Sequence, residues 1–353
     1  MRNDIEAIKR IIYFALWKLQ ADRLFRHINQ KKVLILAYHG ITDRQYKIAP
    51  WTQIHLRLFK QQMRYIKRRY TVISLKDAVD SIRYGKDLPQ NSVVITFDDG
   101  YRNNLTTALP VLEKFRIPAT IFVTAGYVGS SKILPSDEVY ITLLNSKKIG
   151  PINIPEMGLG PLFIDTPENL LDTCLTVDKN LKKFPAKSQV RLLSILRRIF
   201  GYNLEGDFGL IEDCRLLSWD DIRVLLKKDF IQIGAHTVSH EILTNVSHEE
   251  ARREIIDSKS VIEEKLNCRI SMFAYPNGTA ADYDDNHIEH LKENGFICGM
   301  TTIPKLNNAF DNPYHLGRFS IGHNSSSRLS NFSLRVSGAI AALKSLNGDS
   351  FPQ

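Results

Sequence analysis

The amino-acid sequence predicts an α/β fold in which one (β/α) barrel occupies most of the chain, and three observations point to it. Short apolar runs alternate with stretches of helical periodicity from Val33 onward, as in βα units built around a parallel sheet. Acidic residues and histidines directly follow several of these runs, and in such barrels functional groups gather at the carboxyl ends of strands. The length of 353 residues suits one large barrel or two mid-sized domains, and the composition, with 43% hydrophobic and 24% charged residues, excludes disordered, collagen-like and coiled-coil chains.

Six strands are expected from the apolar runs. They are Val33–Tyr38, Val93–Phe97, Ala119–Val123, Ile231–Ala235, Met272–Tyr275 and Cys298–Thr302. Apolar residues at helical spacing mark two helices between them, one through Phe59, Met63 and Ile66 and one through Leu105, Leu109, Leu112 and Phe115. A third helix is expected to begin at Ser247, with Glu250 completing a capping box, and to end near Leu266.

Residues 130–214 break this alternation and are expected to form an α-rich insertion on the barrel, whose domain spans residues 31–345. Several prolines and glycines interrupt the pattern, and helical segments follow around Leu170–Leu181 and Val190–Phe200. The βα pattern resumes at Trp219. We therefore expect the insertion to belong to the barrel rather than to form a separate domain.

Residues 1–30 are expected to form a basic amphipathic helix. Its apolar positions are Ile5, Ile8, Ile12, Leu16 and Leu19, and its basic residues are Lys9, Arg10, Lys18, Arg23 and Arg26. Such a helix can make peripheral contact with an anionic membrane surface. The pattern also suits a helix packed on the barrel or across a dimer contact, which is the commoner outcome, so the oligomeric state stays open.

Net charge and targeting signals restrict the partners and the compartment. The net charge of +9 permits anionic partners, but the basic residues are spread along the chain without a nucleic-acid-binding motif, so nucleic acid is not expected. We expect a cytoplasmic location, with the membrane contact described above, because the chain has neither a transmembrane run nor a convincing signal peptide. The four cysteines fit a reducing compartment because they stand far apart; they are Cys174, Cys214, Cys268 and Cys298.

The first candidate chemical group is the pair Asp98 and Asp99, followed by Gly100, at the end of an expected strand. Adjacent carboxylates at a strand end point in different directions, so one can ligate a metal while the other takes a proton. Gly100 would let the chain turn sharply. A plain turn made from Asp-Asp-Gly is the alternative.

The second group is the pair His236 and His240, which follows another apolar run. Histidines four apart lie on one face of a helix and can bind one cation. With Asp99 they would make a His₂Asp set that leaves an open coordination position. Either histidine alone would more often be structural.

Two more strand ends carry candidate groups. The loop Phe273–Gly278 can aim a backbone N–H at a developing oxyanion, although an ordinary turn fits it equally well. His39, at the end of the first expected strand, could protonate a leaving amine. Taken alone, neither segment is strong evidence.

Together these segments resemble the polysaccharide deacetylase family, carbohydrate esterase family 4, which shares the chitooligosaccharide-deacetylase (NodB) homology domain. Thr96–Gly100 is similar to its first motif, and His236–His240 fits the His-[Ser/Thr]-x-x-His second motif. The flanking segments that also resemble the family are Tyr101, Ala108–Leu112, Pro118–Val123 and Phe273–Pro276. The resemblance covers residues 32–130 and 215–325 and implies a distorted, seven-stranded TIM-like barrel.

The resemblance also implies roles for individual residues. Asp98 would be the general base, and Asp99, His236 and His240 would ligate one divalent cation. The family's third motif commonly carries an arginine that orients the base, but Ala274 stands there in this chain.

In this respect the chain resembles the poly-N-acetylglucosamine deacetylase branch of the family. In that branch the motifs are circularly permuted, and the acid histidine lies in a Leu-x-Tyr-His segment. Leu36–His39 matches that segment, which makes His39 the expected acid and His323 its rival. Arg318 is the candidate for the orienting arginine. The alternative is that Arg318 is an ordinary surface residue.

The function implied is metal-dependent hydrolysis of N-acetyl groups on a polysaccharide or oligosaccharide. Zn²⁺ suits the ligand set, and Co²⁺ or Ni²⁺ could occupy it. The backbone N–H of Asn277 is expected to hold the oxyanion, while Tyr101 and Tyr275 are expected to contact the sugar. Trp219 could also stack on a sugar ring, or could pack in the core.

Two other functions stay open at this point. One is deacylation of a lipid-linked or nucleotide-linked sugar at the cytoplasmic membrane face. The other is a catalytically silent glycan-binding barrel, against which the complete set of aspartates and histidines argues.

Overall fold

The computed structural model describes residues 11–46, 48, 50–146, 148, 150–202, 208–322 and 328–346. Its strands are β1 (Leu34–Tyr38), β2 (Gly40–Thr42), β3 (Gln53–His55), β4 (Thr71–Val72), β5 (Ser92–Phe97), β6 (Ala119–Val123), β7 (Ile152–Ile154), β8 (Leu159–Leu162), β9 (Ile231–Ala235), β10 (Met272–Ala274), β11 (Cys298–Met300) and β12 (Phe319–Ser320). Its α-helices are α2 (Ala21–Ile28), α3 (Leu56–Arg69), α4 (Leu75–Tyr84), α5 (Leu109–Phe115), α6 (Pro135–Leu144), α7 (Pro167–Leu181), α8 (Ala186–Phe200), α9 (Phe208–Asp213), α10 (Trp219–Leu226), α11 (His248–Leu266), α12 (Asp285–Glu293), α13 (Leu329–Val336) and α14 (Ala339–Leu346).

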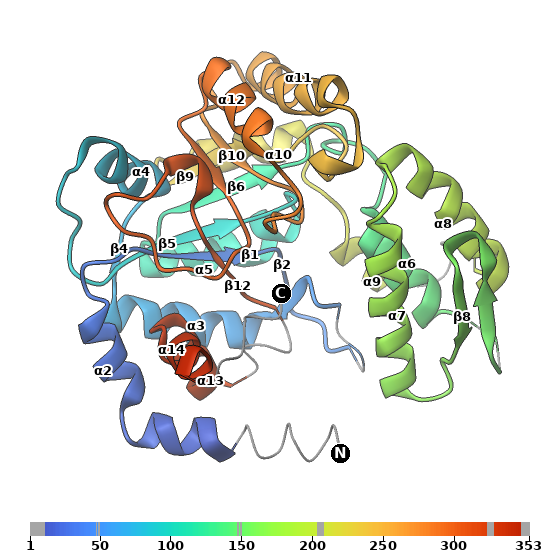
Figure 1. Ribbon diagram of the computed structural model, residues 1–353, viewed down its shortest axis with the longest axis horizontal. Helices are drawn as coiled ribbons and strands as arrows, with labels where there is room; N and C mark the ends of the chain where they lie inside the picture. Colours follow the sequence, from blue (N-terminus) through green and yellow to red (C-terminus); the bar gives the residue numbers. More distant parts are fainter. Residues whose placement is uncertain are drawn as a thin grey trace.

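The central sheet is parallel and curled (Figure 1). Within the described residues, seven strands follow one another in the order β11-β10-β9-β6-β5-β1-β12, and β4 pairs with β5. Between the two ends of this order, the Thr301 N–H donates to the Leu316 carbonyl at 2.8 Å and the Arg318 N–H donates to the Ile303 carbonyl at 3.0 Å. These bonds draw the ends together into a distorted TIM-like barrel, which confirms the predicted fold class.

Strand alternation divides the apolar residues between two faces of the barrel wall. Leu34 and Leu36 of β1 belong to a large cluster shared with the surrounding helices, whereas Val33 and Ile35 belong to a second cluster on the inner face. Val94 of β5 also lies in the inner cluster. Successive side chains of a strand point to opposite faces, so every second residue of these strands faces inward.

All six predicted strands are present, and their ends differ by at most two residues. Helices α3, α5 and α11 also lie where the periodicity predicts them, with a π-helical turn at Asn104–Ala108 before α5. Ser247 and Glu250 form the expected capping box at the start of α11. The strand that completes the order, β12, has only two residues and was not predicted.

The insertion packs around its own apolar cluster. Helices α6, α7 and α8 contribute Val139, Val177 and Leu196, and β7 pairs with β8 as an antiparallel hairpin. Figure 1 places this green segment beside the barrel. The domain boundaries stay predictions.

The N-terminal segment is not one continuous helix. The described part is helical from residue 11 to residue 18, and the chain then turns at Gln20, where φ is 59°, before α2 begins. The apolar positions Ile5 and Ile8 lie outside the described residues. Within the described part of the chain, no helix is long and apolar enough to cross a membrane.

Candidate active site

Three barrel strands direct side chains into the same end of the barrel. His39, Asp98 and His236 each continue the inward-facing register of β1, β5 and β9, one residue beyond the carboxyl end of the strand. On β5, for example, Val94 and Thr96 face inward, and Asp98 takes the next inward position. Parallel strands end at one rim, so the three side chains meet there.

Asp98 forms a buried ion pair with Arg318. Its two carboxylate oxygens accept from Nη1 and Nη2 of Arg318, both at 2.7 Å, and both side chains are almost wholly buried. Arg318 also donates from Nε to the Thr301 carbonyl and from Nη1 to the Thr96 hydroxyl. The guanidinium is therefore fixed in place and holds the carboxylate in one orientation.

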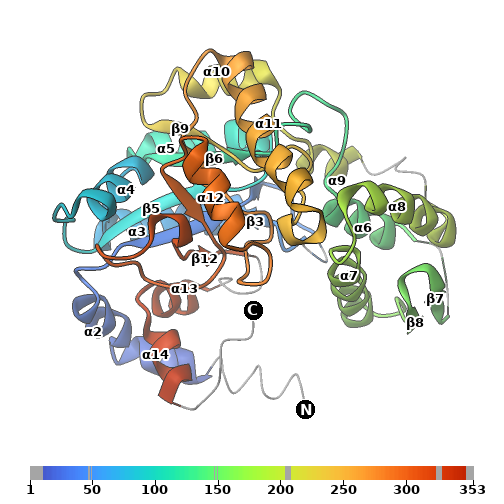
Figure 2. The ribbon, with the colours of Figure 1, turned by 45° about the horizontal axis from the view of Figure 1, so that its top comes forward.

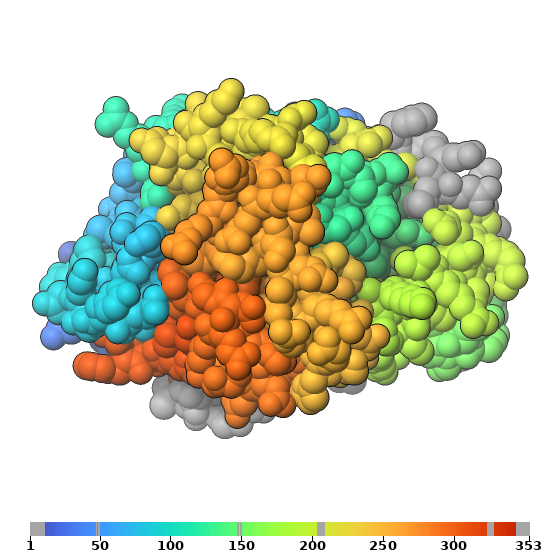
Figure 3. Space-filling model, turned by 90° about the horizontal axis from the view of Figure 1, so that it is seen from above, coloured from blue at the N-terminus to red at the C-terminus, as the bar shows by residue number. Residues whose placement is uncertain are grey.

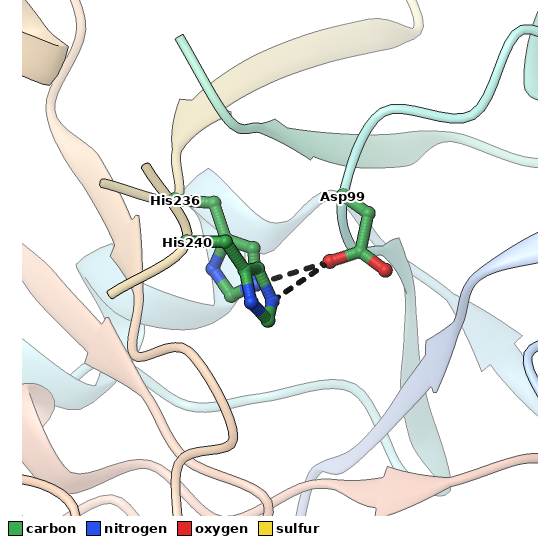
Figure 4. A group of neighbouring side chains, drawn as sticks. All are labelled: Asp99, His236 and His240. Atoms are coloured by element: carbon green, nitrogen blue, oxygen red, sulfur yellow. Dashed lines mark ion pairs between the residues drawn. The ribbon is translucent and has the colours of Figure 1, made fainter. Parts of the chain in front are cut away.

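Asp99 faces the two histidines, and all three side chains converge (Figure 4). Its Oδ1 atom lies 3.4 Å from Nε2 of His236 and 3.2 Å from Nε2 of His240. Asp99 has a φ of 72° and Gly100 one of 80°, so the chain turns sharply after β5, as expected. This turn directs Asp99 to the rim although its neighbour Asp98 faces the barrel interior.

The two histidines do not share a helix, so that part of the sequence interpretation is wrong. They lie on a loop after β9, in which Thr237 and His240 have φ values of 61° and 60°. The Glu254 carboxylate accepts from the backbone N–H groups of Val238 and Ser239 at 2.8 and 2.9 Å. Glu254 thus satisfies the loop backbone from α11, and a non-helical loop brings the two imidazoles together.

Burial and charge set the protonation of the two aspartates. Burial alone would raise the pKa of Asp98, but Arg318 and His236 outweigh it and hold that pKa below its ordinary value. Burial likewise opposes ionisation of Asp99, while the imidazoles of His236 and His240 lower its pKa well below the usual range. Both carboxylates are ionised at neutral pH.

The donor set suits a divalent cation. Asp99, His236 and His240 each present one ligand atom, and these atoms lie within 4.8 Å of one another. The Asp99 Oδ1 atom is buried yet has no hydrogen-bond partner of good geometry among the described residues. Nδ1 of His236 lies 2.8 Å from the Ala274 carbonyl, to which it can donate, and this leaves Nε2 as a free lone pair.

His39 lies at the same rim. It is 8% exposed, its Nδ1 atom has no partner among the described residues, and its ring packs edge-on against Trp51 at 4.8 Å between centroids. Burial lowers the pKa of His39, against the opposing effect of Asp99 and Asp98. The rival acid His323 lies outside the described residues.

Asn277 lines the site with a φ of 59°, and its side-chain amide donates to Asp282 at 2.8 Å. Tyr101 and Tyr275 also border the site, but they are 1% and 0% exposed. Their hydroxyls donate to Asp137 and to the Tyr314 carbonyl. Both rings are therefore buried in this structure, and contact of these two residues with the sugar stays a prediction.

Trp219 is partly buried and packs against the barrel core, in agreement with its alternative interpretation. Trp51 is instead the partly exposed aromatic residue at the site, with Nζ of Lys182 5.6 Å from its ring centroid. It precedes β3 in a connection outside the barrel strands, so no strand-end signal marked it.

The cavity at the rim has a volume of about 80 Å³. Its lining includes His39, both aspartates and both histidines, and the insertion adds Leu134, Pro135, Ser136, Lys182 and Gln189. This volume is well below the roughly 300–1,000 Å³ of typical ligand pockets. The cavity therefore admits a small group and water rather than a whole saccharide.

Comparison with known families identifies the chain. A family model described as polysaccharide deacetylase matches residues 85–157 and 167–298, which contain both aspartates and both histidines of the site. The chain belongs to the polysaccharide deacetylase family. His39 and Arg318 lie outside the matched residues, so family membership alone does not assign their roles.

Solved structures of deacetylases share the fold. One is the Streptococcus pyogenes deacetylase PplD in complex with acetate, with 20% identity, a TM-score of 0.55, and coverage of 84% of this chain and 95% of that chain. Another is IcaB from Ammonifex degensii, with 19% identity, a TM-score of 0.56, and coverage of 86% and 97%. At such low identity these similarities establish the fold alone.

Curated relatives match over shorter stretches. YxkH of Bacillus subtilis is 30% identical over 109 residues, which is 31% of this chain and 37% of that protein. The poly-beta-1,6-N-acetyl-D-glucosamine N-deacetylase of Escherichia coli K12 is 28% identical over 85 residues, 24% of this chain and 12% of that protein. The enzyme of the same name in Staphylococcus epidermidis is 36% identical over 74 residues, 21% and 25%. The chain thus spans between 12% and 37% of the length of these relatives.

Proposed function

We propose that this protein is a hydrolase that removes N-acetyl groups from the amino sugars of a polysaccharide or oligosaccharide, with one bound divalent cation. The observation that carries the proposal is the arrangement at the rim. A carboxylate held by two 2.7 Å bonds from Arg318 lies directly beside a His₂Asp ligand set, in one small cavity. Family membership supports the same reaction.

Asp99, His236 and His240 would hold the cation, and Zn²⁺ suits this set, with Co²⁺ or Ni²⁺ as substitutes. When bound, a divalent cation supplies Lewis acidity that polarises a carbonyl group and acidifies water. The chain's own part is to place the imidazoles: the Ala274 carbonyl fixes the ring of His236, and Glu254 fixes the loop that carries His240.

Asp98 acts as the general base. Its lowered pKa keeps it ionised at neutral pH, and Arg318 keeps both oxygens in place, so one of them can take a proton from the attacking water. The developing oxyanion would be met by the backbone N–H of Asn277. The bond from the Asn277 side chain to Asp282 and the bond from Thr302 to the Asn277 carbonyl hold that loop in position.

His39 acts as the acid that protonates the departing amine. As the acid, His39 would take a proton from solvent, give it to the amine nitrogen as the C–N bond breaks, and regain the proton that Asp98 removes from the attacking water. Burial lowers the pKa of His39, and the carboxylates of Asp99 and Asp98 oppose this effect and favour its protonated form. The products are acetate and a free amino sugar.

We propose β-1,6-linked N-acetylglucosamine oligomers as the substrate class, because two relatives bear the name of that activity. The cavity would take the acetamido group, with Trp51 beside it offering a ring to the sugar. The test is acetate release from these oligomers by Zn²⁺-loaded protein, compared with β-1,4-linked oligomers. No acetate from either would reject the function, and release only from the latter would reject the linkage.

The comparisons give no support to the lipid-linked or nucleotide-linked alternative or to the silent glycan-binding barrel. The cytoplasmic location stays a prediction from the sequence.

We also propose that residues 11–28 rest on an anionic membrane surface. Half or more of the side chain is exposed at four large apolar residues here: Ile11 (70%), Leu19 (79%), Leu24 (58%) and Ile28 (61%). Beside them lies a groove of about 750 Å³ whose lining includes the basic residues Lys18, Arg23, Arg26, Arg64, Arg68 and Arg69, with Asp22 as its one carboxylate among the described residues. Exposed apolar side chains next to clustered cations suit acyl chains next to anionic headgroups.

A further inference from the structure

We infer that His248, Asp284 and His287 form a second divalent-cation site, separate from the proposed catalytic one. Each offers one ligand atom, and these atoms lie within 4.8 Å of one another. The rings of His248 and His287 are 5.6 Å apart between centroids. Two imidazoles and a carboxylate are a ligand set for zinc, cobalt, nickel or copper rather than for calcium or magnesium.

The buried imidazole of His287 is the second observation that points to a ligand. His287 is 1% exposed, and its Nε2 atom has no hydrogen-bond partner among the described residues. Its Nδ1 atom accepts from the Asp284 backbone N–H at 3.0 Å and lies 3.0 Å from Oδ1 of Asp284, so the cap of α12 holds this ring beside the Asp284 carboxylate. A buried polar atom without a partner destabilises the fold, and a bound cation would offset that cost.

The surroundings of the cluster favour a cation and give it access. His248 is exposed, so an ion can reach the cluster from solvent. Glu249, Glu250 and Asp285 lie in the first turns of the two helices and add negative charge there. These carboxylates also offset the positive ends of the helix dipoles, which would otherwise oppose a bound cation.

The site joins two helices that follow loops of the proposed active site. His248 is the first residue of α11, and Asp284 caps α12, and these helices lie side by side (Figure 2). They form part of one continuous orange surface in Figure 3. The chain before α11 carries His240, and the chain before α12 carries Asn277. A cation here would hold the His240 loop and the Asn277 loop together, reinforcing the bond from the Thr244 hydroxyl to the Ala281 carbonyl.

The experiment counts zinc in the full-length protein after equilibrium dialysis against Zn²⁺, with elemental analysis of the protein fraction. The wild type is expected to hold two ions per chain. His248→Ala should hold one and should keep acetate release measurable, because His248 is exposed and touches no part of the proposed catalytic set. The matched control is His27→Ala, an exposed histidine of α2, which should keep two.

A double variant separates this inference from the proposed function. His236→Ala with His240→Ala should still bind one Zn²⁺, and adding His248→Ala should abolish that binding. Zinc should also raise the unfolding midpoint of the double variant and fail to raise that of the triple variant. No ion in the His236→Ala, His240→Ala double variant, or a wild-type count unchanged by His248→Ala, would overturn the second site whatever the activity of the first.

Discussion

Arg318 offers the sharpest perturbation of the proposed catalytic base. In Arg318→Gln the Asp98 carboxylate loses both 2.7 Å bonds while staying almost wholly buried. Hydrogen bonds to charged groups contribute about 1.5–3 kcal/mol each, and breaking a buried pair by removing one partner costs about 3–5 kcal/mol. We therefore expect a loss of about 3–5 kcal/mol in the free energy of unfolding at neutral pH. We expect kcat/KM to fall by about 10²-fold or more, the scale of general-base catalysis.

The pKa of Asp98 sets the direction in which the pH dependence of Arg318→Gln should differ from that of the wild type. In the wild type the pKa of Asp98 is depressed, so the pair stabilises the fold above the unfolded-state pKa of about 3.9 and loses that effect as pH falls through the folded-state pKa. Without Arg318, burial is opposed less and raises the pKa of Asp98. The acidic limb of kcat/KM should therefore move to higher pH.

The assay is acetate release across a pH series, with thermal unfolding measured on the same samples. Arg335→Gln, at a partly buried arginine of α13, serves as the control. Its kcat/KM should show the same acidic limb as that of the wild type. Adding Arg318→Gln to Asp98→Asn should lower the rate little further, since the two residues act as one unit. A folded Arg318→Gln protein with the wild-type acidic limb and near wild-type kcat/KM would refute the reasoning.

Further predictions concern the base, the acid, the histidine loop and the N-terminal segment. Asp98→Asn should abolish acetate release while Zn²⁺ stays bound, and unchanged turnover would reject its role. His39→Gln should lower kcat by about 10²-fold or more with zinc content unchanged, as measured by acetate release and elemental analysis. Glu254→Gln should weaken Zn²⁺ binding about tenfold or more in a competition titration, because the His240 loop loses its charged acceptor; equal affinity would contradict that. Leu19→Ser with Leu24→Ser should reduce sedimentation with vesicles of anionic phospholipid, with Phe310→Ser, at a still more exposed apolar residue, as the control.

Much of this fold could be predicted from the spacing of apolar residues and from the residues that interrupt it. The six main strands are nearly continuous apolar runs, as expected for strands covered on both faces, and the helices between them keep regular spacing. The rim residues followed from the same logic, because the carboxyl ends of parallel strands meet at one edge. Asp98, Asp99, His236 and His39 were placed together on this basis.

The remaining parts of the site depend on contacts that no local pattern encodes. Arg318 precedes β12, whose two residues are too few to show alternation, and only tertiary structure places its guanidinium against Asp98. The histidine loop was interpreted as a helix because its spacing of four fits one, whereas the contact with Glu254 holds a different backbone. The insertion residues at the cavity, such as Lys182, follow no barrel period at all.

The most direct test of the central claim is anomalous diffraction from crystals of the Zn²⁺-loaded protein, recorded on both sides of the zinc absorption edge. Our account predicts a zinc peak within roughly 2.0–2.2 Å of the Asp99 carboxylate and of Nε2 of His236 and His240. Fully loaded crystals that show zinc elsewhere and none among these three side chains would contradict it.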